Sequence, residues 1–342
     1  MPRWLKRRPF FALSVCFLSA LILYVLLLDR QNIPRTNQDD KRRAGERDYV
    51  LDTASILGSV FWPKGAVRSK SQNKQNGTKN EVQIFQRSMD IGTDLKYEKV
   101  KLKTTKGEVP FYVYTSELDT MISSRVRDFG TWEEDLLEQT AKLLLKYKDI
   151  TFLDLGCNIG VYTMSIAVLG ADVIAVDAVP DNLQLLSMSL SSWRFHSNVT
   201  LVWNAISNKY KQVKIEIPSG NIGGAHVVET KDDSAKNLVP TILVDDLIPL
   251  VKTRNIAIKM DIEGHEVNAL QGAKTFFQTF DVKFILMEFM HHRSQDSGHT
   301  IENFLVRNGF MPYGNVADGK ILNLQNFYNW PENVFWIKRW DY

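Results

Sequence analysis

The sequence predicts a doubly wound α/β fold, in which helices cover both faces of a mostly parallel sheet. Short apolar strands alternate with helical segments through the second half of the chain. The first of these strands breaks into a glycine-spaced turn, and an acidic residue closes the strand that follows. Strands and helices that alternate in this way form parallel sheets with helices on both sides.

The expected elements follow one another in a regular order. A helix is expected over 132–147, where apolar residues recur at helical spacing, and 110–114 is strand-like. Strands are expected at 151–155, 173–177, 199–203, 255–260, 283–288 and 334–337, with further helices at 161–169, 181–192, 264–279 and 300–307. Residues 213–217 and 225–228 predict a hairpin that turns at glycines.

The turn after the first strand predicts a nucleoside site. Gly156 and Gly160 allow a tight turn and leave room for a ligand near the main chain. Asp177 closes the next strand, about twenty residues further on, where an acid can bind ribose hydroxyls. Asn158 stands where a dinucleotide site carries another glycine, so the pattern favours a nucleoside without a pyrophosphate.

Three ordered blocks resemble the FkbM family of S-adenosylmethionine-dependent methyltransferases. They cover 154–163, 180–182 and 258–273, within a region of resemblance at 130–310. The chain departs from the family at Asp177, where Glu is commoner, and at Ala178, where many members carry Pro. The resemblance implies a class I methyltransferase (Rossmann-like) sheet of seven strands, one of them antiparallel, and S-adenosylmethionine as the cofactor.

Cofactor contacts are expected beyond the carboxyl ends of the strands, where open α/β sheets bind ligands. The expected residues are Asp154, Gly156, Asn158, Gly160, Asp177, Asn204 and Ala205. Asp177 is expected to bind the ribose, because an unpaired acid after an apolar strand needs a partner; otherwise it forms the turn before Pro180. Asp154 is expected at the amino-acid end of the cofactor, or else as a helix cap. Asn204 and Ala205 lie where such enzymes contact adenine.

The candidate catalytic residues are Asp261, Glu263 and His265, at a strand-to-helix junction. Methyl transfer needs an aligned donor and acceptor, and a hydroxyl acceptor must lose its proton. Asp261 is the leading base and His265 the second choice. Glu263 and Glu266 are alternatively first-turn carboxylates that the helix dipole favours. Lys259 shares a strand face with Asp261 and is expected to pair with it.

No dedicated metal site is predicted. Glu288 is followed by His291 and His292, but two adjacent histidines rarely bind one metal together. A magnesium-assisted reaction that uses Asp261 and Glu288 stays open, because hard carboxylates suit that ion.

The N-terminal residues predict a membrane anchor. Residues 10–28 carry no charge and are long enough to cross a bilayer core of about 30 Å. Basic residues precede them, which places the N-terminus in the cytoplasm and the rest in the secretory lumen. A cleaved signal peptide is the alternative, but no small-residue cleavage site follows. The predicted organisation is a cytoplasmic tail over 1–9, a transmembrane signal-anchor over 10–28, a lumenal stem over 29–95 and a catalytic domain over 96–342.

The net charge and the cysteine content limit which binding partners and covalent cross-links can be expected. The net charge is +3, and residues 1–30 carry +4 of charge, which leaves −1 for the rest. The basic balance therefore gives no support for nucleic-acid binding. Only Cys16 and Cys157 are present, one in the anchor and one in the turn, so no lumenal disulfide is expected. Asn76 and Asn198 begin glycosylation sequons, but Asn198 opens a predicted buried strand, which disfavours its modification.

Together these features predict a single-pass type II Golgi enzyme that methylates a hydroxyl, on a hexose of a glycan or glycoprotein. The acceptor follows from the resemblance, since FkbM relatives are generally O-methyltransferases, and from the anchor-plus-stem layout of lumenal glycan-modifying enzymes. Two alternatives stay open. One is a lipid or small-molecule O-methyltransferase of the endoplasmic reticulum. The other is a catalytically inactive membrane-tethered binding module, which would retain Asp177 but need neither Asp261 nor His265.

Overall fold

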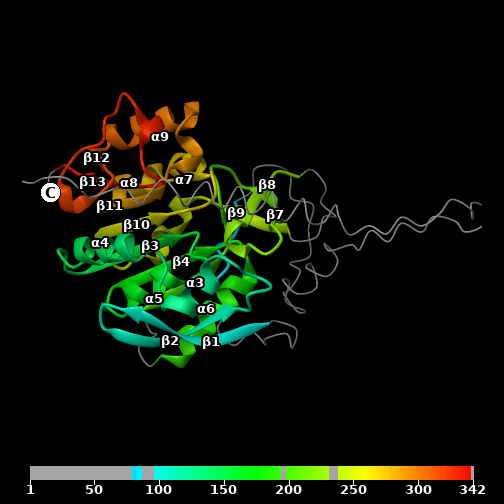
Figure 1. Cartoon of the computed structure of the whole chain (residues 1–342). Coiled ribbons are helices and arrows are strands. Elements are labelled where there is room, and N and C mark those ends of the chain that lie inside the picture. The colour runs from blue at the N-terminus through cyan, green and yellow to red at the C-terminus, as the bar shows by residue number, and fades with distance from the viewer. Residues whose placement is uncertain (1–78, 87–95, 194–197, 231–237, 340–342) are drawn as a thin grey trace, which may run out of the picture. The chain divides into compact units, whose positions relative to one another are not determined.

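A seven-stranded sheet forms the centre of the computed structural model, which describes residues 79–86, 96–193, 198–230 and 238–339 (Figure 1). Its strands are β3 (Ile150–Leu155), β4 (Asp172–Asp177), β5 (Val199–Trp203), β10 (Asn255–Met260), β11 (Asp281–Glu288), β12 (Phe310–Tyr313) and β13 (Asn333–Lys338). Their order across the sheet is β12-β13-β11-β10-β3-β4-β5. Only β13 runs against its neighbours, pairing antiparallel with both β11 and β12. This order confirms the predicted class I methyltransferase-like sheet with one antiparallel strand near an edge.

Helices cover both faces of this sheet (Figure 1). One face carries α4 (Glu134–Leu144), α5 (Val161–Ala167) and α6 (Pro180–Ser192), and the other carries α7 (Glu266–Gln271), α8 (Lys274–Thr279) and α9 (Asp296–Arg307). Successive strand residues point to opposite faces, so Phe152 joins the first apolar cluster while Leu153 joins the second. The apolar residues of each strand therefore alternate between the two clusters, one on each face of the sheet.

The helix predicted over 264–279 is wrong as a single element, because it is split between α7 and α8. The Asp245 carboxylate, from a 3-10 segment η2 (Val244–Leu250), accepts hydrogen bonds from the backbone N–H groups of Thr275 (3.1 Å) and Phe276 (2.7 Å). A Cβ atom at Gly272 would also lie 2.6 Å from the carbonyl oxygen of Ser207. The second helix is thus capped by a distant residue, which periodicity along 264–279 cannot reveal.

Two smaller sheets flank the central one. β1 (Tyr97–Thr104) and β2 (Gly107–Tyr114) form an antiparallel hairpin beside α3 (Ile122–Phe129), and this hairpin packs on α6, with the Tyr114 hydroxyl donating to Asn182 Oδ1 at 2.8 Å. A four-stranded sheet combines β6 (Ala205–Ile206), β7 (Gln212–Glu216), β8 (His226–Val228) and β9 (Leu238–Ile242) in the order β6-β9-β7-β8. Its β7–β8 pair is the predicted hairpin.

The N-terminal part of the described chain packs along an edge of the central sheet. Residues 79–86, which were expected in the stem, lie on the domain: Phe85 N–H donates to the carbonyl of Leu201 at 2.9 Å, and Trp203 N–H donates to that of Gln83 at 2.8 Å. Phe85 is buried. Because β5 is an edge strand of the central sheet, the side of its backbone that faces away from β4 can bond such a segment.

The predicted anchor at 10–28 and most of the stem lie outside the described residues. Within the part of the chain that the structure describes, no helix has the length and apolar character needed to cross a membrane.

Candidate active site

A cavity of about 470 Å³ lies at the carboxyl ends of the central strands. Small-molecule sites typically enclose about 300–1,000 Å³, so its size suits a nucleoside with an acceptor group beside it. Eight of the predicted site residues line it: Gly156, Asn158, Asp177, Asn204, Ala205, Asp261, Glu263 and His265. Asp154 and Gly160 are not among the residues that line it. Loop residues 221–225, around the 3-10 turn η1 (Ile222–Gly224), close another side.

The glycine turn is built for close approach. Gly156 has a φ of +79°, and a Cβ atom there would lie 1.8 Å from the Asp261 carbonyl oxygen. Gly160 has a φ of +91°, and its Cβ would lie 2.3 Å from a methyl group of Leu186. Asn158 has a φ of +50°, a conformation that asparagine tolerates better than most residues. Gly156 therefore allows the turn to pack against the Asp261 backbone at the cavity wall, and Gly160 allows it to pack against Leu186 of α6.

Asp177 is not the unpaired acid that the sequence argument assumed. Its carboxylate accepts hydrogen bonds from the backbone N–H of Asn158 (2.8 Å) and Val179 (2.8 Å) and from Asn182 Nδ2 (3.2 Å). Burial nevertheless raises the pKa of Asp177 to about 6, against these three stabilising donors. Asp177 therefore forms the turn before Pro180, as the alternative interpretation predicts. Because each carboxylate oxygen has two lone pairs, ribose binding remains compatible with it.

Asp154, which is expected at the amino-acid end of the cofactor, does not line the cavity. Its side chain is fully buried, and Thr163 Oγ1 donates to its Oδ2 at 2.6 Å. The backbone N–H of Thr163, at the start of α5, also bonds it. The alternative interpretation of Asp154 as a helix cap fits this geometry. Burial raises the pKa of Asp154 above its usual range.

Asn204 and Ala205 line the cavity, but the asparagine side chain holds the chain rather than a ligand. Asn204 Oδ1 accepts from the backbone N–H of Gln83 at 2.8 Å, and its Nδ2 donates to the carbonyls of Pro240 (3.1 Å) and Glu81 (3.4 Å). Both amide hydrogens are thereby engaged. What remains on the cavity wall is a small apolar surface centred on Ala205, which suits a flat ring.

The predicted pair of Lys259 and Asp261 is confirmed, with Lys259 Nζ 3.0 Å from Asp261 Oδ2. The lysine side chain is only 8% exposed, whereas that of Asp261 is 32% exposed. Burial alone lowers the pKa of Lys259, but the carboxylates of Asp261, Asp154 and Glu133 raise it above its usual range. Lys259 therefore stays protonated and fixes the Asp261 carboxylate at the cavity.

His265 lines the cavity but is held by its neighbours. Asn268 Nδ2 lies 3.3 Å from His265 Nδ1, and the imidazole also hydrogen-bonds the backbone of Val227. Burial lowers the pKa of His265, so the ring is neutral at neutral pH. A neutral ring suits a base, but two existing partners leave it little freedom to accept a proton.

Glu266 takes the structural role that the dipole interpretation gave it, at the start of α7. Its side chain is fully buried, its Oε1 accepts from the Ile262 N–H at 2.9 Å, and its Oε2 lies 2.7 Å from His292 Nε2. Glu263 differs, because its carboxylate lines the cavity. Burial raises the pKa of Glu263 above its usual range, and the nearby charge of Asp261 adds to the effect.

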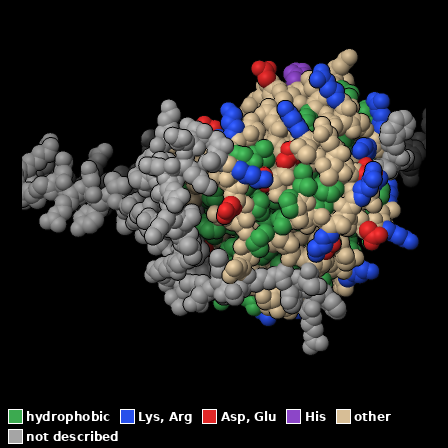
Figure 2. Space-filling view, turned by 180° about the vertical axis from the view of Figure 1, so that it is seen from behind, with side chains coloured by type: hydrophobic (Ala, Val, Ile, Leu, Met, Phe, Trp, Pro, Cys, Tyr) green, Lys and Arg blue, Asp and Glu red, His purple; other side chains and the backbone are tan. Residues whose placement is uncertain are grey.

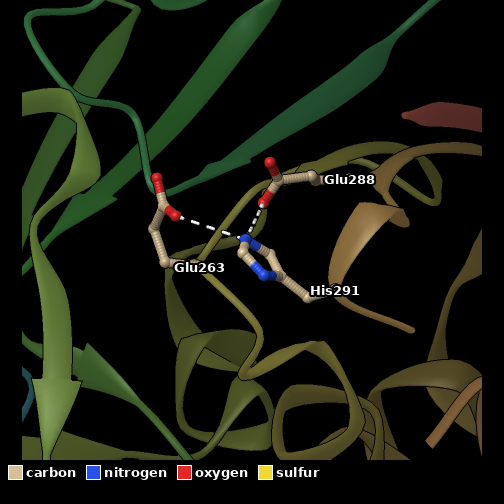
Figure 3. Close-up of side chains that lie close together, drawn as sticks. All are labelled: Glu263, Glu288 and His291. Atoms are coloured by element: carbon tan, nitrogen blue, oxygen red, sulfur yellow. Dashed lines mark ion pairs between the residues drawn. The ribbon is translucent and has the colours of Figure 1, made fainter. Parts of the chain in front are cut away.

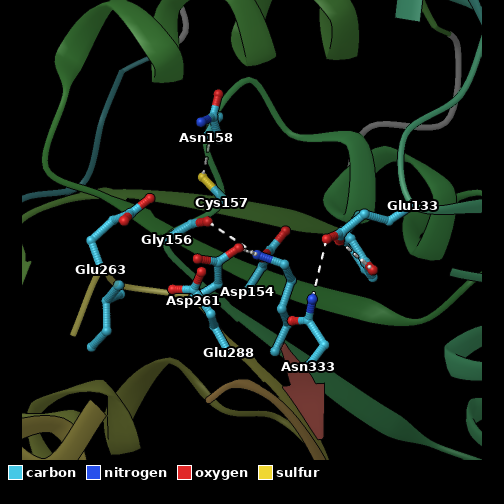
Figure 4. A network of polar contacts seen from close by, with 12 residues as sticks. Glu133, Asp154, Gly156, Cys157, Asn158, Asp261, Glu263, Glu288 and Asn333 are labelled. Carbon is cyan, nitrogen blue, oxygen red and sulfur yellow. Dashed lines mark hydrogen bonds and ion pairs between the residues drawn. The ribbon is translucent and has the colours of Figure 1, made fainter. Parts of the chain in front are cut away.

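Sequence reasoning missed Glu133, which also lines the cavity. Its carboxylate accepts from the Tyr162 hydroxyl at 2.9 Å. It also accepts from Asn333 Nδ2 at 3.4 Å (Figure 4). Burial raises the pKa of Glu133 above its usual range. No local pattern identifies this acid, because Asn333 lies 200 residues further along the chain. Its carboxylate can bind a cationic group of a ligand, such as an amino group.

One family model matches part of the chain. Residues 154–312 match the family model of the methyltransferase FkbM domain. The search of the curated proteins finds no match.

Several solved structures resemble the chain. A precorrin-6y C5,15-methyltransferase from Geobacter metallireducens shows 15% identity and a TM-score of 0.32, covering 54% of this chain and 79% of its own. An rRNA methylase from Streptococcus thermophilus shows 14% identity and a TM-score of 0.33, covering 59% and 93%. A magnesium protoporphyrin IX methyltransferase from Synechocystis with bound SAM shows 15% identity and a TM-score of 0.32, covering 60% and 82%. The match of residues 154–312 to the methyltransferase FkbM domain supports S-adenosylmethionine as the cofactor.

Proposed function

We propose that the chain is an S-adenosylmethionine-dependent O-methyltransferase whose acceptor is a sugar hydroxyl on secretory-pathway glycans. The observation that carries the proposal is the position of the Asp261 carboxylate. It faces the same cavity as the glycine turn and Asp177, and Lys259 holds it at 3.0 Å. A fixed carboxylate beside a methyl-donor site is suited to take a proton from a hydroxyl.

The residues present fit the cofactor. Ala205 and the apolar wall beside it would accept adenine, Asp177 the ribose hydroxyls, and Glu133 the amino group of the methionine part. When bound, S-adenosylmethionine supplies an electrophilic methyl group. The chain then has to exclude water, align the acceptor oxygen, and receive its proton at Asp261.

Two carboxylates near Asp261 favour a polyhydroxylated acceptor over a lipid chain. Glu263 and Glu288 both line the cavity, and the charge of Asp261 acts on both. Carboxylates and amides can bind several sugar hydroxyls at once, and they fix which oxygen points at the donor.

We place the enzyme in the Golgi membrane, with the anchor at 10–28 and the catalytic domain lumenal; the endoplasmic reticulum is the alternative. We expect no nucleic-acid partner. On the face shown in Figure 2, Lys and Arg side chains are interspersed with Asp and Glu rather than gathered in a single stripe.

Methyl-labelled donor tests the reaction. Full-length protein in detergent is incubated with labelled S-adenosylmethionine and three acceptor sets: oligosaccharides, glycolipids and hydroxylated lipids without sugars. Tandem mass spectrometry should locate the label as a methyl ether on a sugar carbon, and Asp261→Asn should remove it. Label on a nitrogen atom, or only on sugar-free lipids, contradicts the proposal. Donor binding without turnover on any acceptor indicates the inactive binding module.

Membrane topology needs its own test. Full-length protein carrying a C-terminal tag is expressed in cells, and intact microsomes are treated with protease. The tag should be protected, and glycosidase should shift the protein through the Asn76 sequon. Digestion of the tag without detergent contradicts the lumenal placement.

A further inference from the structure

Three side chains from separate elements converge on one point of the cavity (Figure 3). Glu263 lies in the loop after β10, Glu288 ends β11, and His291 belongs to the 3-10 turn η3 (Met290–His292). One ligand atom from each, the imidazole nitrogen and two carboxylate oxygens, lie within 4.8 Å of one another. These are side chains that bind metal ions.

The separations are those of ligands around an ion, not of hydrogen bonds. His291 Nε2 lies 3.5 Å from Glu263 Oε2 and 3.6 Å from Glu288 Oε2. Good N–H···O hydrogen bonds are about 2.7–3.2 Å long. Two ligands that each lie about 2.1 Å from one ion are separated by about 3.4 Å at a tetrahedral angle and by about 3.6 Å at an angle of about 120°. The measured separations of 3.5 and 3.6 Å match these open angles at an ion.

The atoms that face one another have no other partner. Glu288 Oε2 and His291 Nε2 are both buried, and beyond the ion-pair contacts of 3.5–3.6 Å within the cluster neither has a hydrogen-bond partner in the described part of the chain. A buried polar atom without a partner costs about 1–3 kcal/mol, so native structures rarely leave two of them face to face. A shared cation would satisfy both.

The backbone holds these groups in place. Glu263 and Gly264 both have positive φ, +54° and +88°, and a Cβ atom at Gly264 would lie 3.6 Å from His291 Cβ. The loop therefore packs against the base of the His291 side chain. His292 is committed elsewhere, to Glu266 at 2.7 Å and Ser297 Oγ at 2.8 Å, which anchors the turn that presents His291. Only one of the two adjacent histidines faces the cavity cluster.

We propose that Glu263, Glu288 and His291 bind one divalent cation of the manganese class, on the acceptor side of the cavity. Mixed imidazole and carboxylate ligands suit such ions, and three protein ligands leave positions for the acceptor. The role assigned to the ion rests on the proposed O-methylation: a hydroxyl on the cation loses its proton to the Asp261 carboxylate more readily. The oxygen then forms the bond to the methyl carbon as the carbon–sulfur bond breaks. The magnesium alternative that paired Asp261 with Glu288 is thereby replaced by a different ligand set.

Direct binding of Mn²⁺ tests the site without any turnover. Full-length protein in detergent is stripped with chelator and titrated with Mn²⁺, and the free ion is followed by electron paramagnetic resonance. We expect one bound Mn²⁺ per chain, and at least about tenfold weaker binding in Glu288→Gln and His291→Asn. Mn²⁺ should also raise the melting temperature of the wild type but not of these variants.

Matched controls separate ligand loss from general damage. Glu138→Gln, on the exposed face of α4, and His299→Asn, on the surface of α9, should bind Mn²⁺ like the wild type. Melting in chelator shows whether each variant folds. Equal Mn²⁺ affinity in wild type and His291→Asn overturns the site. If Mn²⁺ binds at this site but no hydroxyl is methylated, the metal site is supported and the proposed O-methylation is contradicted. If methylation is complete in the presence of chelator, the ion has no role in the reaction.

Discussion

Gly156 lies so close to Asp261 that a Cβ atom on the glycine would sit 1.8 Å from the aspartate carbonyl oxygen. The contact joins the turn after β3 to the end of β10. Lys259 strengthens the junction, since its Nζ lies 3.4 Å from the Gly156 carbonyl and 3.0 Å from the Asp261 carboxylate. The cofactor turn and the proposed base are thus parts of one packed unit, and a change in one is transmitted to the other.

Gly156→Ala should therefore destabilise the protein and abolish donor binding together. Overpacking costs about 1–3 kcal/mol, and the positive φ of +79° adds about 1–2 kcal/mol for alanine. Gly170→Ala is the matched control: its φ is +92°, but a Cβ there meets nothing within 4 Å. Chemical denaturation of both variants in detergent gives the comparison. Equal losses would show that backbone strain alone, rather than the contact with Asp261, makes Gly156 necessary.

The local pattern of apolar residues and glycines was sufficient to predict most strands of the central sheet. β3, β4 and β10 are short apolar runs that end in a glycine turn or an acid, and the structure places them within one or two residues of the expected bounds. The same pattern brought Asp261 and Asp177 to one edge, since parallel strands share their carboxyl ends.

What the sequence could not predict depends on contacts between distant segments. Asp245, which caps α8 and so separates it from α7, lies about thirty residues before that helix in the sequence. The spacing of apolar residues within 264–279 cannot predict such a contact. Asp177 looked unpaired because its donors at Asn158 and Asn182 come from the glycine turn and from the first turn of α6. The approach of Glu263 to His291 depends on two left-handed residues in one loop, which no spacing rule encodes.

Asp261→Asn should keep donor affinity within about twofold and reduce turnover by about 10²–10⁴, the usual contribution of a general base. The amide retains the shape of the side chain but cannot take the proton. His265→Asn, tested beside it, distinguishes the two candidate bases. Because the imidazole already contacts Asn268 and Val227, its loss should lower turnover far less. Calorimetry with the donor and steady-state rates supply both readouts; the reverse ranking would move the base to His265.

Lys259→Met should destabilise the fold by about 3–5 kcal/mol, because it leaves buried carboxylates without their cation. Asp154 and Glu133 are the partners besides Asp261. Lys252→Met provides the contrast, since its lysine side chain is 63% exposed and lies 3.5 Å from Asp172. An exposed pair of that kind contributes about 0–1 kcal/mol. Denaturant midpoints and slopes for both variants measure the difference, and similar values would mean that the buried carboxylates are neutral without Lys259.

Donor affinity should fall at acidic pH through Asp177, whose pKa is raised to about 6 by burial. The ionised carboxylate accepts ribose hydroxyls, so affinity is constant above about pH 7 and falls about tenfold per unit well below 6. Calorimetry with the demethylated product avoids the sulfonium charge. Asp177→Ala should show no binding at any pH, while Asp181→Asn, which does not line the cavity, should keep the wild-type profile. A flat profile down to pH 5 would exclude the ionised form of Asp177 from ribose recognition.

Asp181→Asn should make the protein less sensitive to alkaline pH. Asp181 is 6% exposed, burial raises its pKa to about 8, and its Oδ2 makes no hydrogen bond to any described residue. An unfolded aspartate ionises near pH 3.9, so between that value and 8 the folded chain holds a proton that the unfolded chain has released. Raising the pH therefore lowers the free energy of unfolding of the wild type, by up to about 1.4 kcal/mol per unit, until the slope levels above 8.

Asparagine does not ionise, so the difference in unfolding free energy between Asp181→Asn and the wild type should grow steadily from pH 5 to pH 8. Denaturant curves at pH 5, 6, 7 and 8 measure it. Asp135→Asn, at an exposed position in the first turn of α4, should show a constant offset instead. Parallel curves for wild type and Asp181→Asn would mean that the folded protein ionises Asp181 at an ordinary pKa, which requires a partner for the buried carboxylate oxygen.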